Sequence, residues 1–227
     1  MQYLFPPPQL PAVPVADSDQ LFPVHRIYCV GKNYADHIRE MGSDPAREPP
    51  CFFLKPADSV VTNGRMPYPP GTRNLHYEGE LVLAIGRGGN DIAPEQALAH
   101  VYGFALGLDM TRRDLQTAAS GLGQPWDTGK SFDYCAPMAA ITPGQTVPAG
   151  RLQLWVNGKL RQDAELVAMI WQPHEIISQL SRLYTLQPGD LIFTGTPAGV
   201  GAVLPGDHIE LGCGALEPLA LRVEAAN

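Results

Sequence analysis

The stretch His76-Tyr-Glu-Gly-Glu-Leu-Val-Leu-Ala-Ile85 decides the fold prediction, because it places two carboxylates at the start of a buried strand. Side chains alternate between faces along a strand, so Glu78 and Glu80 point the same way, together with Val82 and Ala84. Two like charges about 5 Å apart at an effective dielectric constant of about 20 repel by roughly 3 kcal/mol, before any desolvation cost is added. We therefore expect a positive group between the two glutamates.

A divalent metal ion is one such group. A third carboxylate, Asp109, directly follows the apolar run Val101–Leu108, which predicts a second buried strand with a charge at its tip. Carboxylate oxygens are the ligands that Mg²⁺ prefers, and the ion usually keeps positions open for a substrate. The local pattern also fits two glutamates at a solvated strand end, but the third acid favours the metal interpretation.

Length and composition indicate a globular protein that binds a small molecule. The chain has 227 residues, of which 44% are hydrophobic and 17% charged, enough for one large domain with a substantial core. A net charge of −7 argues against a nucleic-acid partner. We find neither a signal peptide nor an apolar run of membrane-spanning length, and no Cys-x-x-Cys pair, so we expect a cytoplasmic protein with reduced thiols and no membrane partner.

Two segments are expected along the chain. Residues 1–25 carry six prolines and should form an extended arm packed along a surface, while residues 26–227 should form the catalytic domain. Asn157-Gly158, between two alternating apolar runs, is the strongest hairpin signal, because this pair readily adopts positive φ angles. Many short strands and few helices predict a strand-dominated α+β fold. Strands are expected at residues 26–31, 51–54, 78–85, 101–108, 191–193 and 208–211, helices at 33–41, 111–120 and 173–184, and loops at 63–71 and 121–129.

Several polar residues outside the acidic trio are candidates for chemistry. His37 and Glu40 lie three residues apart on a predicted helix, so the carboxylate can orient the imidazole as a general base, although an exposed, solvated pair fits the same spacing. Arg113 and Gln116 follow Asp109 within about two helical turns and can converge on one side, where the arginine binds a carboxylate or makes a surface ion pair.

Two further segments are candidates for binding an anion. Lys130 follows a Gly-rich loop, where its ammonium group can meet an oxyanion, although a lone lysine is more often a solvated charge. The segment Thr194-Gly-Thr-Pro-Ala-Gly-Val-Gly201 follows a predicted core strand and contains Gly195 and Thr196. Its glycines are expected to leave backbone N–H groups free for an anionic ligand.

Six ordered motifs together resemble the fumarylacetoacetate hydrolase family over roughly residues 25–225. The motifs are Tyr28-Cys-Val-Gly-Lys-Asn-Tyr-Ala-Asp-His37, Phe53-Leu-Lys-Pro56, His76-Tyr-Glu-Gly-Glu-Leu81, Gly107-Leu-Asp-Met-Thr-Arg-Arg-Asp-Leu-Gln116, Lys130-Ser-Phe-Asp133 and Phe193-Thr-Gly-Thr-Pro-Ala-Gly-Val-Gly201. The resemblance implies a β-roll fold with few short helices, and commonly a homodimer. It also implies a Mg²⁺ or Mn²⁺ ion held by Glu78, Glu80 and Asp109.

The resemblance further implies roles for the remaining candidates. His37 with Glu40 would be the dyad that activates water, on a lid segment, and Arg113, Gln116, Lys130 and Thr196 match residues that contact substrate. The implied reaction is hydrolysis of a carbon–carbon bond in a small anionic 2,4-diketo acid. The motifs Glu48-Pro-Pro50, Tyr68-Pro-Pro-Gly71, Pro125-Trp126 and Ile170-Trp171 are most similar to bacterial enzymes that convert fumarylpyruvate to fumarate and pyruvate.

Three other functions remain open at this point. Another acylpyruvate would use the same chemistry on a different acyl group. Oxaloacetate decarboxylation, or isomerisation of a hydroxymuconate-type compound, would keep the ion and omit the attack by water. A non-catalytic protein that binds a keto acid or a metal would need neither the dyad nor turnover.

Overall fold

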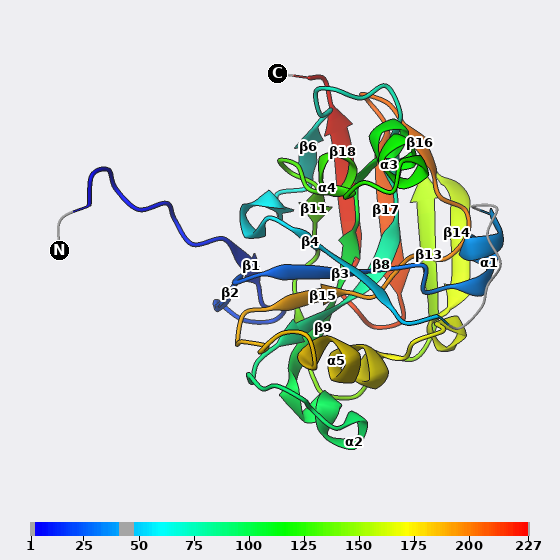
Figure 1. The fold of residues 1–227 in the computed structure, drawn as a ribbon. Helices are drawn as coiled ribbons and strands as arrows, with labels where there is room; N and C mark the ends of the chain where they lie inside the picture. The colour runs from blue at the N-terminus through cyan, green and yellow to red at the C-terminus, as the bar shows by residue number, and fades with distance from the viewer. Residues whose placement is uncertain (1–2, 41–47, 227) are drawn as a thin grey trace.

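In the computed structural model, which describes residues 3–40 and 48–226, a central six-stranded sheet faces a five-stranded sheet, and short helices lie around their ends (Figure 1). The prediction of a strand-dominated α+β fold with few short helices is confirmed. In spatial order, the central sheet contains β12 (Thr142–Pro143), β9 (Val101–Leu108), β8 (Gly79–Ile85), β15 (Leu191–Phe193), β3 (Ile27–Gly31) and β4 (Cys51–Lys55). Only the β15–β3 pair within this sheet is parallel.

The other strands form one large sheet and three small ones. The five-stranded sheet contains, in order, β14 (Lys159–Glu165), β13 (Arg151–Val156), β17 (His208–Cys213), β18 (Leu219–Glu224) and β6 (Arg65–Pro67). The three-stranded sheet contains β10 (Thr111–Arg112), β7 (Leu75–Tyr77) and β16 (Gly201–Val203), and the two-stranded pairs are β1 (Ala12–Pro14) with β2 (Leu21–Pro23) and β11 (Ala136–Pro137) with β5 (Val60–Val61).

The helices of the described residues are short. The α-helices are α1 (Ala35–Glu40), α2 (Pro94–Ala97), α3 (Arg113–Gly121), α4 (Asp127–Lys130) and α5 (Pro173–Ser181), and the 3₁₀ turns are η1 (Ala57–Ser59), η2 (Leu98–His100) and η3 (Leu166–Ala168). Within the part of the chain that the structure describes, no helix is long and apolar enough to cross a membrane.

Strand β8 is buried along its whole length because apolar clusters cover both of its faces. Leu81 and Leu83 belong to a cluster that includes Leu154 of the five-stranded sheet. Val82, on the other face, belongs to a second cluster that includes Val13 of β1. Full burial of an apolar side chain of this size stabilises the fold by about 1.5–3 kcal/mol. The core therefore holds the strand that carries the glutamates in a fixed position.

Several local predictions are confirmed and others are corrected. Asn157 (φ 51°) and Gly158 (φ 73°) form the expected turn between β13 and β14. The predicted loop at residues 63–71 contains β6, because Met66 is fully buried and its backbone pairs with β18. The predicted helix at residues 111–120 begins only at Arg113, because residues 111–112 pair with β7. Met41, the expected end of the first helix, lies outside the described residues.

The N-terminal segment has two parts. Strands β1 and β2 form a hairpin that buries Val13 and Phe22 against the body of the protein. Residues 3–10 are extended, as expected, but they run away from the body, where Leu4 is 96% exposed (Figure 1). The expectation that this part packs along a surface is therefore wrong for the single chain, because no described element of the chain covers it.

Candidate metal and active site

The chain switches sheets at the first carboxylate of the acidic trio. Glu78 stands between β7 and β8, where the chain leaves the three-stranded sheet and enters the central one. Strand β9 pairs antiparallel with β8 and ends at Leu108, so Asp109 arrives beside Glu78, and its N–H donates to the Glu78 carbonyl at 2.9 Å. All three acids are buried, and one oxygen from each of Glu78, Glu80 and Asp109 lies within 4.8 Å of the others. The predicted convergence is confirmed.

Two of the three acids are neutralised by buried cations. Lys130 Nζ lies 2.7 Å from Glu78 Oε2, 2.7 Å from Asp109 Oδ2 and 2.8 Å from Thr111 Oγ1. Arg113 donates from Nη2 to Glu78 Oε1. Burial alone raises the pKa of a carboxyl group, but the charges of Lys130 and Arg113 outweigh it and hold the pKa of Glu78 well below its ordinary value. Glu78 is therefore ionised at neutral pH, and both acids lie within a network of hydrogen bonds.

The third cation, Lys55, was not predicted from the sequence as a site residue. Its side chain is completely buried, and Nζ lies 2.7 Å from Asp109 Oδ1. The same ammonium group donates to the carbonyl oxygens of Met110, at 3.0 Å, and Lys130, at 2.5 Å. Burial opposes its charge, but Asp109 raises the pKa of Lys55 above its ordinary value. The sequence feature that could have identified Lys55 is its place at the end of an apolar strand, within one of the family motifs.

Glu80 differs from the other two acids because no described cation pairs with it. Its Oε2 accepts a hydrogen bond from the N–H of Gly195 at 2.7 Å. Burial raises the pKa of Glu80 well above its ordinary value, and the charges of Asp109 and Glu78 raise it further. An ionised Glu80 therefore has an uncompensated buried charge, which a divalent cation would neutralise.

The residues present fit a hard divalent cation. Mg²⁺ and Mn²⁺ prefer oxygen ligands, and the three buried carboxylates supply them at one point. The uncompensated Glu80 gives this point the negative charge that an ion requires. The solvated-strand-end interpretation of Glu78 and Glu80 is wrong, because both side chains are at most 6% exposed in a cluster of buried charges.

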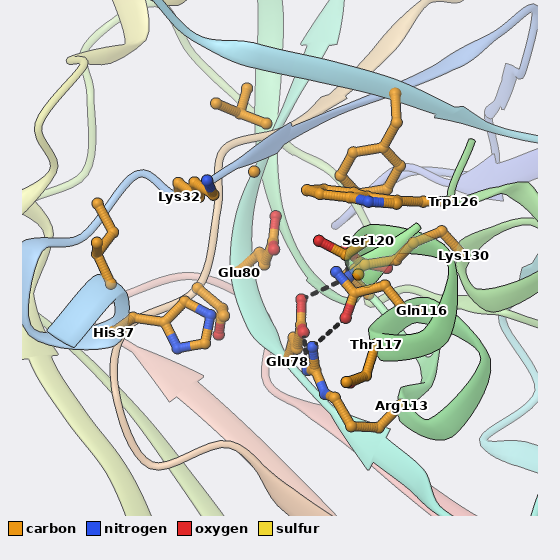
Figure 2. A pocket seen from close by; sticks show the side chains of 17 residues that line it. Lys32, His37, Glu78, Glu80, Arg113, Gln116, Thr117, Ser120, Trp126 and Lys130 are labelled. Atoms are coloured by element: carbon orange, nitrogen blue, oxygen red, sulfur yellow. Dashed lines mark hydrogen bonds and ion pairs between the residues drawn. The ribbon is translucent and has the colours of Figure 1, made fainter. Parts of the chain in front are cut away.

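The predicted dyad is present at the edge of the same site. His37 Nδ1 lies 3.2 Å from Glu40 Oε2, and the ring of His37 points toward Glu78 in Figure 2. The Glu40 carboxylate also accepts the N–H of Gly199 at 3.1 Å, which ties α1 to the loop after β15. A carboxylate that accepts from Nδ1–H leaves the lone pair of a neutral imidazole on Nε2. This arrangement suits a general base.

The loop after β15 is joined to the residues of the site by hydrogen bonds. Thr196 donates its hydroxyl proton to the Gly79 carbonyl at 2.9 Å and accepts from Gln162 at 2.8 Å. Gly195 has φ +97°, and a β-carbon there would lie 2.6 Å from Asn33 Cβ, so glycine is required on both counts. The expectation that the N–H groups of this loop stay free for a ligand is wrong at Gly195 and Gly199, because both donate to protein carboxylates.

These residues surround one cavity of about 330 Å³ (Figure 2). This size is at the lower end of the range of about 300–1,000 Å³ typical of small-ligand sites. Arg113 also donates to Gln116 Oε1, so the predicted pair converges with the acids. Two predicted residues do not line the cavity themselves: Glu40 is hydrogen-bonded to His37, and Gly195 is hydrogen-bonded to Glu80. The remaining predicted site residues all line the cavity: His37, Glu78, Glu80, Asp109, Arg113, Gln116, Lys130 and Thr196.

Lys130 departs from expectation in its setting. It lies at the end of the short helix α4 and not on a flexible loop, and its amine is directed at three protein oxygens. An ammonium group has three donors, so contact with a substrate oxygen requires the exchange of one of these bonds. Its role toward an oxyanion stays a prediction.

The fold and the site define a strand-dominated protein with a buried acidic centre for a divalent cation, at the base of a small-ligand cavity. The model of the family "Fumarylacetoacetate (FAA) hydrolase C-terminal" matches residues 26–224, and the chain belongs to this family of enzymes.

Relatives of two activities resemble the chain to a similar degree. A fumarylpyruvate hydrolase of Ralstonia sp is 48% identical over 73% of this chain and 88% of its own. The mitochondrial oxaloacetate tautomerase of Rattus norvegicus is 44% identical over 88% of this chain and 92% of its own. A crystal structure of fumarylpyruvate hydrolase from Pseudomonas aeruginosa, in complex with Mn²⁺ and pyruvate, has a TM-score of 0.96 and 48% identity over 99% of this chain and 100% of that one.

Proposed function

We propose that this protein hydrolyses a carbon–carbon bond of a 2,4-diketo acid, with fumarylpyruvate as substrate and fumarate and pyruvate as products. The observation that carries the proposal is that His37, which is bonded to Glu40, lines the same cavity as the three buried carboxylates. The Ralstonia and Pseudomonas relatives support this choice of substrate.

A Mg²⁺ or Mn²⁺ ion would be held by Glu78, Glu80 and Asp109. When bound, it supplies Lewis-acid polarisation of the oxygens of a keto acid and stabilises the negative charge that develops on them. The Pseudomonas relative, crystallised with Mn²⁺ and pyruvate, supports both the ion and a keto-acid ligand.

His37 provides the general base. Its neutral imidazole takes a proton from water, whose oxygen forms a bond to the carbonyl carbon of the acyl unit. Glu40 accepts from Nδ1–H and stabilises the imidazolium that forms. The bond between that carbon and the methylene carbon of the pyruvoyl unit then breaks, the electron pair goes to the methylene carbon, and this carbon takes up the proton held by His37. The acyl unit leaves as a carboxylic acid.

Four further side chains line the cavity and act on the substrate. Arg113 and Gln116 line the cavity next to Glu78 and offer donors to a carboxylate of the keto acid. Thr196 also lines the cavity, where its hydroxyl group is held by hydrogen bonds to the Gly79 carbonyl and to Gln162. Lys130 is a buried ammonium group beside the acids that also lines the cavity, and it stabilises negative charge on a substrate oxygen when one of its present bonds is exchanged.

Tautomerisation of oxaloacetate is the second candidate function. The similar identity of the oxaloacetate tautomerase relative favours it. That reaction moves one proton between carbon and oxygen, so it needs a base and a polarised carbonyl group but no attack by water. The same cavity could serve both reactions, and the choice between them depends on measured turnover.

One assay separates the two functions. Purified protein with Mg²⁺ is incubated with fumarylpyruvate, and pyruvate release is measured with and without a chelator. We expect release that the chelator abolishes and that His37→Ala lowers by at least about 100-fold, the usual contribution of a general base. A protein that equilibrates the tautomers of oxaloacetate but releases no pyruvate from fumarylpyruvate would instead have the second function.

A further inference from the structure

One cationic side chain of the cavity, Lys32, has no charged partner among the residues that the structure describes. Lys130 and Arg113 line the cavity and are paired with Glu78 and Asp109. Lys32 also lines the cavity, but its ammonium group makes no hydrogen bond or ion pair with any described residue. Lys32 is exposed to solvent at the opening of the cavity. Because no described residue of the lining pairs with Lys32, its ammonium group is available for an anion from outside the protein.

The backbone holds Lys32 in a conformation that its side chain disfavours. Its φ is +59°, in the left-handed region that non-glycine residues rarely adopt. The next residue, Asn33, is completely buried and fixes the segment. Its side-chain amide donates to the carbonyls of Thr194, at 2.7 Å, and Trp171, at 3.0 Å, and its side-chain oxygen accepts the Trp171 N–H at 2.7 Å. Strained backbone that the surroundings enforce in this way is concentrated at ligand sites.

Lys32 lies on the opposite side of the cavity from the substrate-facing donors. It follows directly after β3, whereas Arg113 and Gln116 come from α3 (Figure 2). The carboxylates of Glu78 and Glu80 lie between these two sides in the same view (Figure 2). A ligand that reaches from Arg113 across the acidic centre to Lys32 therefore meets a cationic group at each end.

The wall beside Lys32 is aromatic and flat. The indole of Trp126 packs on the backbone of β3, so that a β-carbon at Gly31 would lie only 3.3 Å from it. Phe53 supports the indole edge-to-face, with 5.9 Å between ring centroids. Both rings line the cavity. Such a wall favours a planar, conjugated group over a branched or tetrahedral one, because a flat group makes contact over its whole face.

We propose that Lys32 and Trp126 form a subsite for the second carboxylate of a planar, unsaturated dicarboxylic acyl unit. The keto-acid end of the ligand lies at the acidic centre, the conjugated chain lies along the indole, and the distal carboxylate pairs with the Lys32 ammonium group. This assignment rests on the proposed hydrolysis of a 2,4-diketo acid and makes Lys32 the residue that selects acyl units with a terminal charge over neutral ones.

The test compares two substrates and three variants. Lys32→Gln removes the charge and keeps most of the length of the side chain, and Lys32→Arg keeps the charge. Lys159→Gln is the matched control, because it removes the same charge from an exposed lysine at the start of β14, outside the cavity. Each protein is assayed with fumarylpyruvate and with acetylpyruvate, whose acyl unit is small and neutral.

We expect Lys32→Gln to lower kcat/KM for fumarylpyruvate about 10-fold, mainly through KM, the usual effect of losing one charged hydrogen bond. The value for acetylpyruvate should change less than 2-fold, Lys32→Arg should restore most of the loss, and Lys159→Gln should behave as the unchanged protein. Inhibition by fumarate should weaken by a similar factor, while inhibition by pyruvate should not change, which measures the subsite without turnover.

Three outcomes would overturn the assignment in distinguishable ways. Equal losses for both substrates would mean that Lys32 acts on the shared keto-acid end or on the fold. No loss for either substrate would mean that the distal carboxylate binds elsewhere. An unchanged protein that hydrolyses neither substrate would refute the proposed function itself, whereas the first two outcomes leave that function intact.

Discussion

The buried cation Lys55 offers the sharpest test of how the site is held together. Its ammonium group pairs with Asp109 at 2.7 Å and donates to two backbone carbonyl groups, and no part of its side chain reaches solvent. Lys55→Met keeps the length and the apolar stem and removes the charge and all three donors. The variant leaves Asp109 with Lys130 as its remaining cation and leaves the carbonyl groups of Met110 and Lys130 without this donor.

The size of the effect follows from burial. Removing one partner of a buried ion pair costs about 3–5 kcal/mol, because the remaining charge stays in a medium of low dielectric constant. Each carbonyl group that loses its donor adds up to about 1–3 kcal/mol, although these contributions overlap with the first. Asp109 keeps its bond to Lys130, which limits the loss. We therefore expect a decrease in the free energy of unfolding of about 3–5 kcal/mol.

The assay is urea unfolding at neutral pH with a chelator present, so that bound metal contributes nothing to the measured free energy. Lys159→Met is the matched control, because Lys159 is exposed and surface substitutions usually change stability by at most about 0.5 kcal/mol. A decrease below about 1 kcal/mol in Lys55→Met, with a normal m-value, would refute the reasoning. It would mean that the Lys55–Asp109 ion pair stabilises the fold little more than an apolar side chain does, as happens for some buried pairs.

Three further predictions concern the metal, the pH and the arm. Mg²⁺ at about 100 times its Kd should stabilise the protein by about 2.7 kcal/mol in a thermal-shift or urea assay. Glu80→Gln should abolish this gain. The same substitution should stabilise the metal-free protein, because it removes the uncompensated buried charge. Burial and the charge of Arg113 lower the pKa of His76 from 6.5 to about 4, so its neutral form contributes stability that is complete above pH 6.5 and is lost as the pH falls toward 4. The urea midpoint of His76→Gln should fall less over that interval than that of the unchanged protein, and parallel curves would contradict the assigned pKa. We expect the full chain to sediment as a homodimer and the chain without residues 1–10 to sediment as a monomer in analytical ultracentrifugation, because Tyr3, Leu4, Phe5 and Leu10 are each at least 68% exposed on an extended segment. A dimer that survives the deletion would show that the arm is not its contact.

The parts of the site that could be predicted are those set by local geometry. The alternation of a strand places Glu78 and Glu80 together, a run of apolar residues brings Asp109 to a strand end, and spacing along a helix brings His37 next to Glu40. The turn at Asn157-Gly158 follows from its backbone preferences alone. Each of these arguments involves residues within about one element, where the chain itself fixes the distance.

The parts that could not be predicted depend on pairings between distant segments. Lys55 meets Asp109 although three strands separate β4 from β9 in the central sheet, and no local pattern reveals this pairing. Lys130 is fixed on α4 by packing against α3, although its sequence neighbours indicate a loop. The extended start of residues 1–25 was predicted, but the hairpin that follows it forms because Val13 and Phe22 find an apolar surface on the body.

The charge balance of the centre determines which ligands it accepts. The carboxylates of Glu78, Glu80 and Asp109 are matched in number by the three buried cations Lys55, Arg113 and Lys130, so without metal the ionised centre has no net charge. The negative charge is nevertheless concentrated at Glu80, because all three cations pair with Glu78 or Asp109 and none pairs with Glu80. A bound divalent cation then leaves two uncompensated positive charges in a buried position, where an anion of charge −2 restores neutrality and an anion of charge −1 does not. The centre should therefore favour a ligand with two negative charges over its singly charged analogue. This preference acts in addition to the pairing at Lys32, because it depends on total charge and not on where the second carboxylate lies.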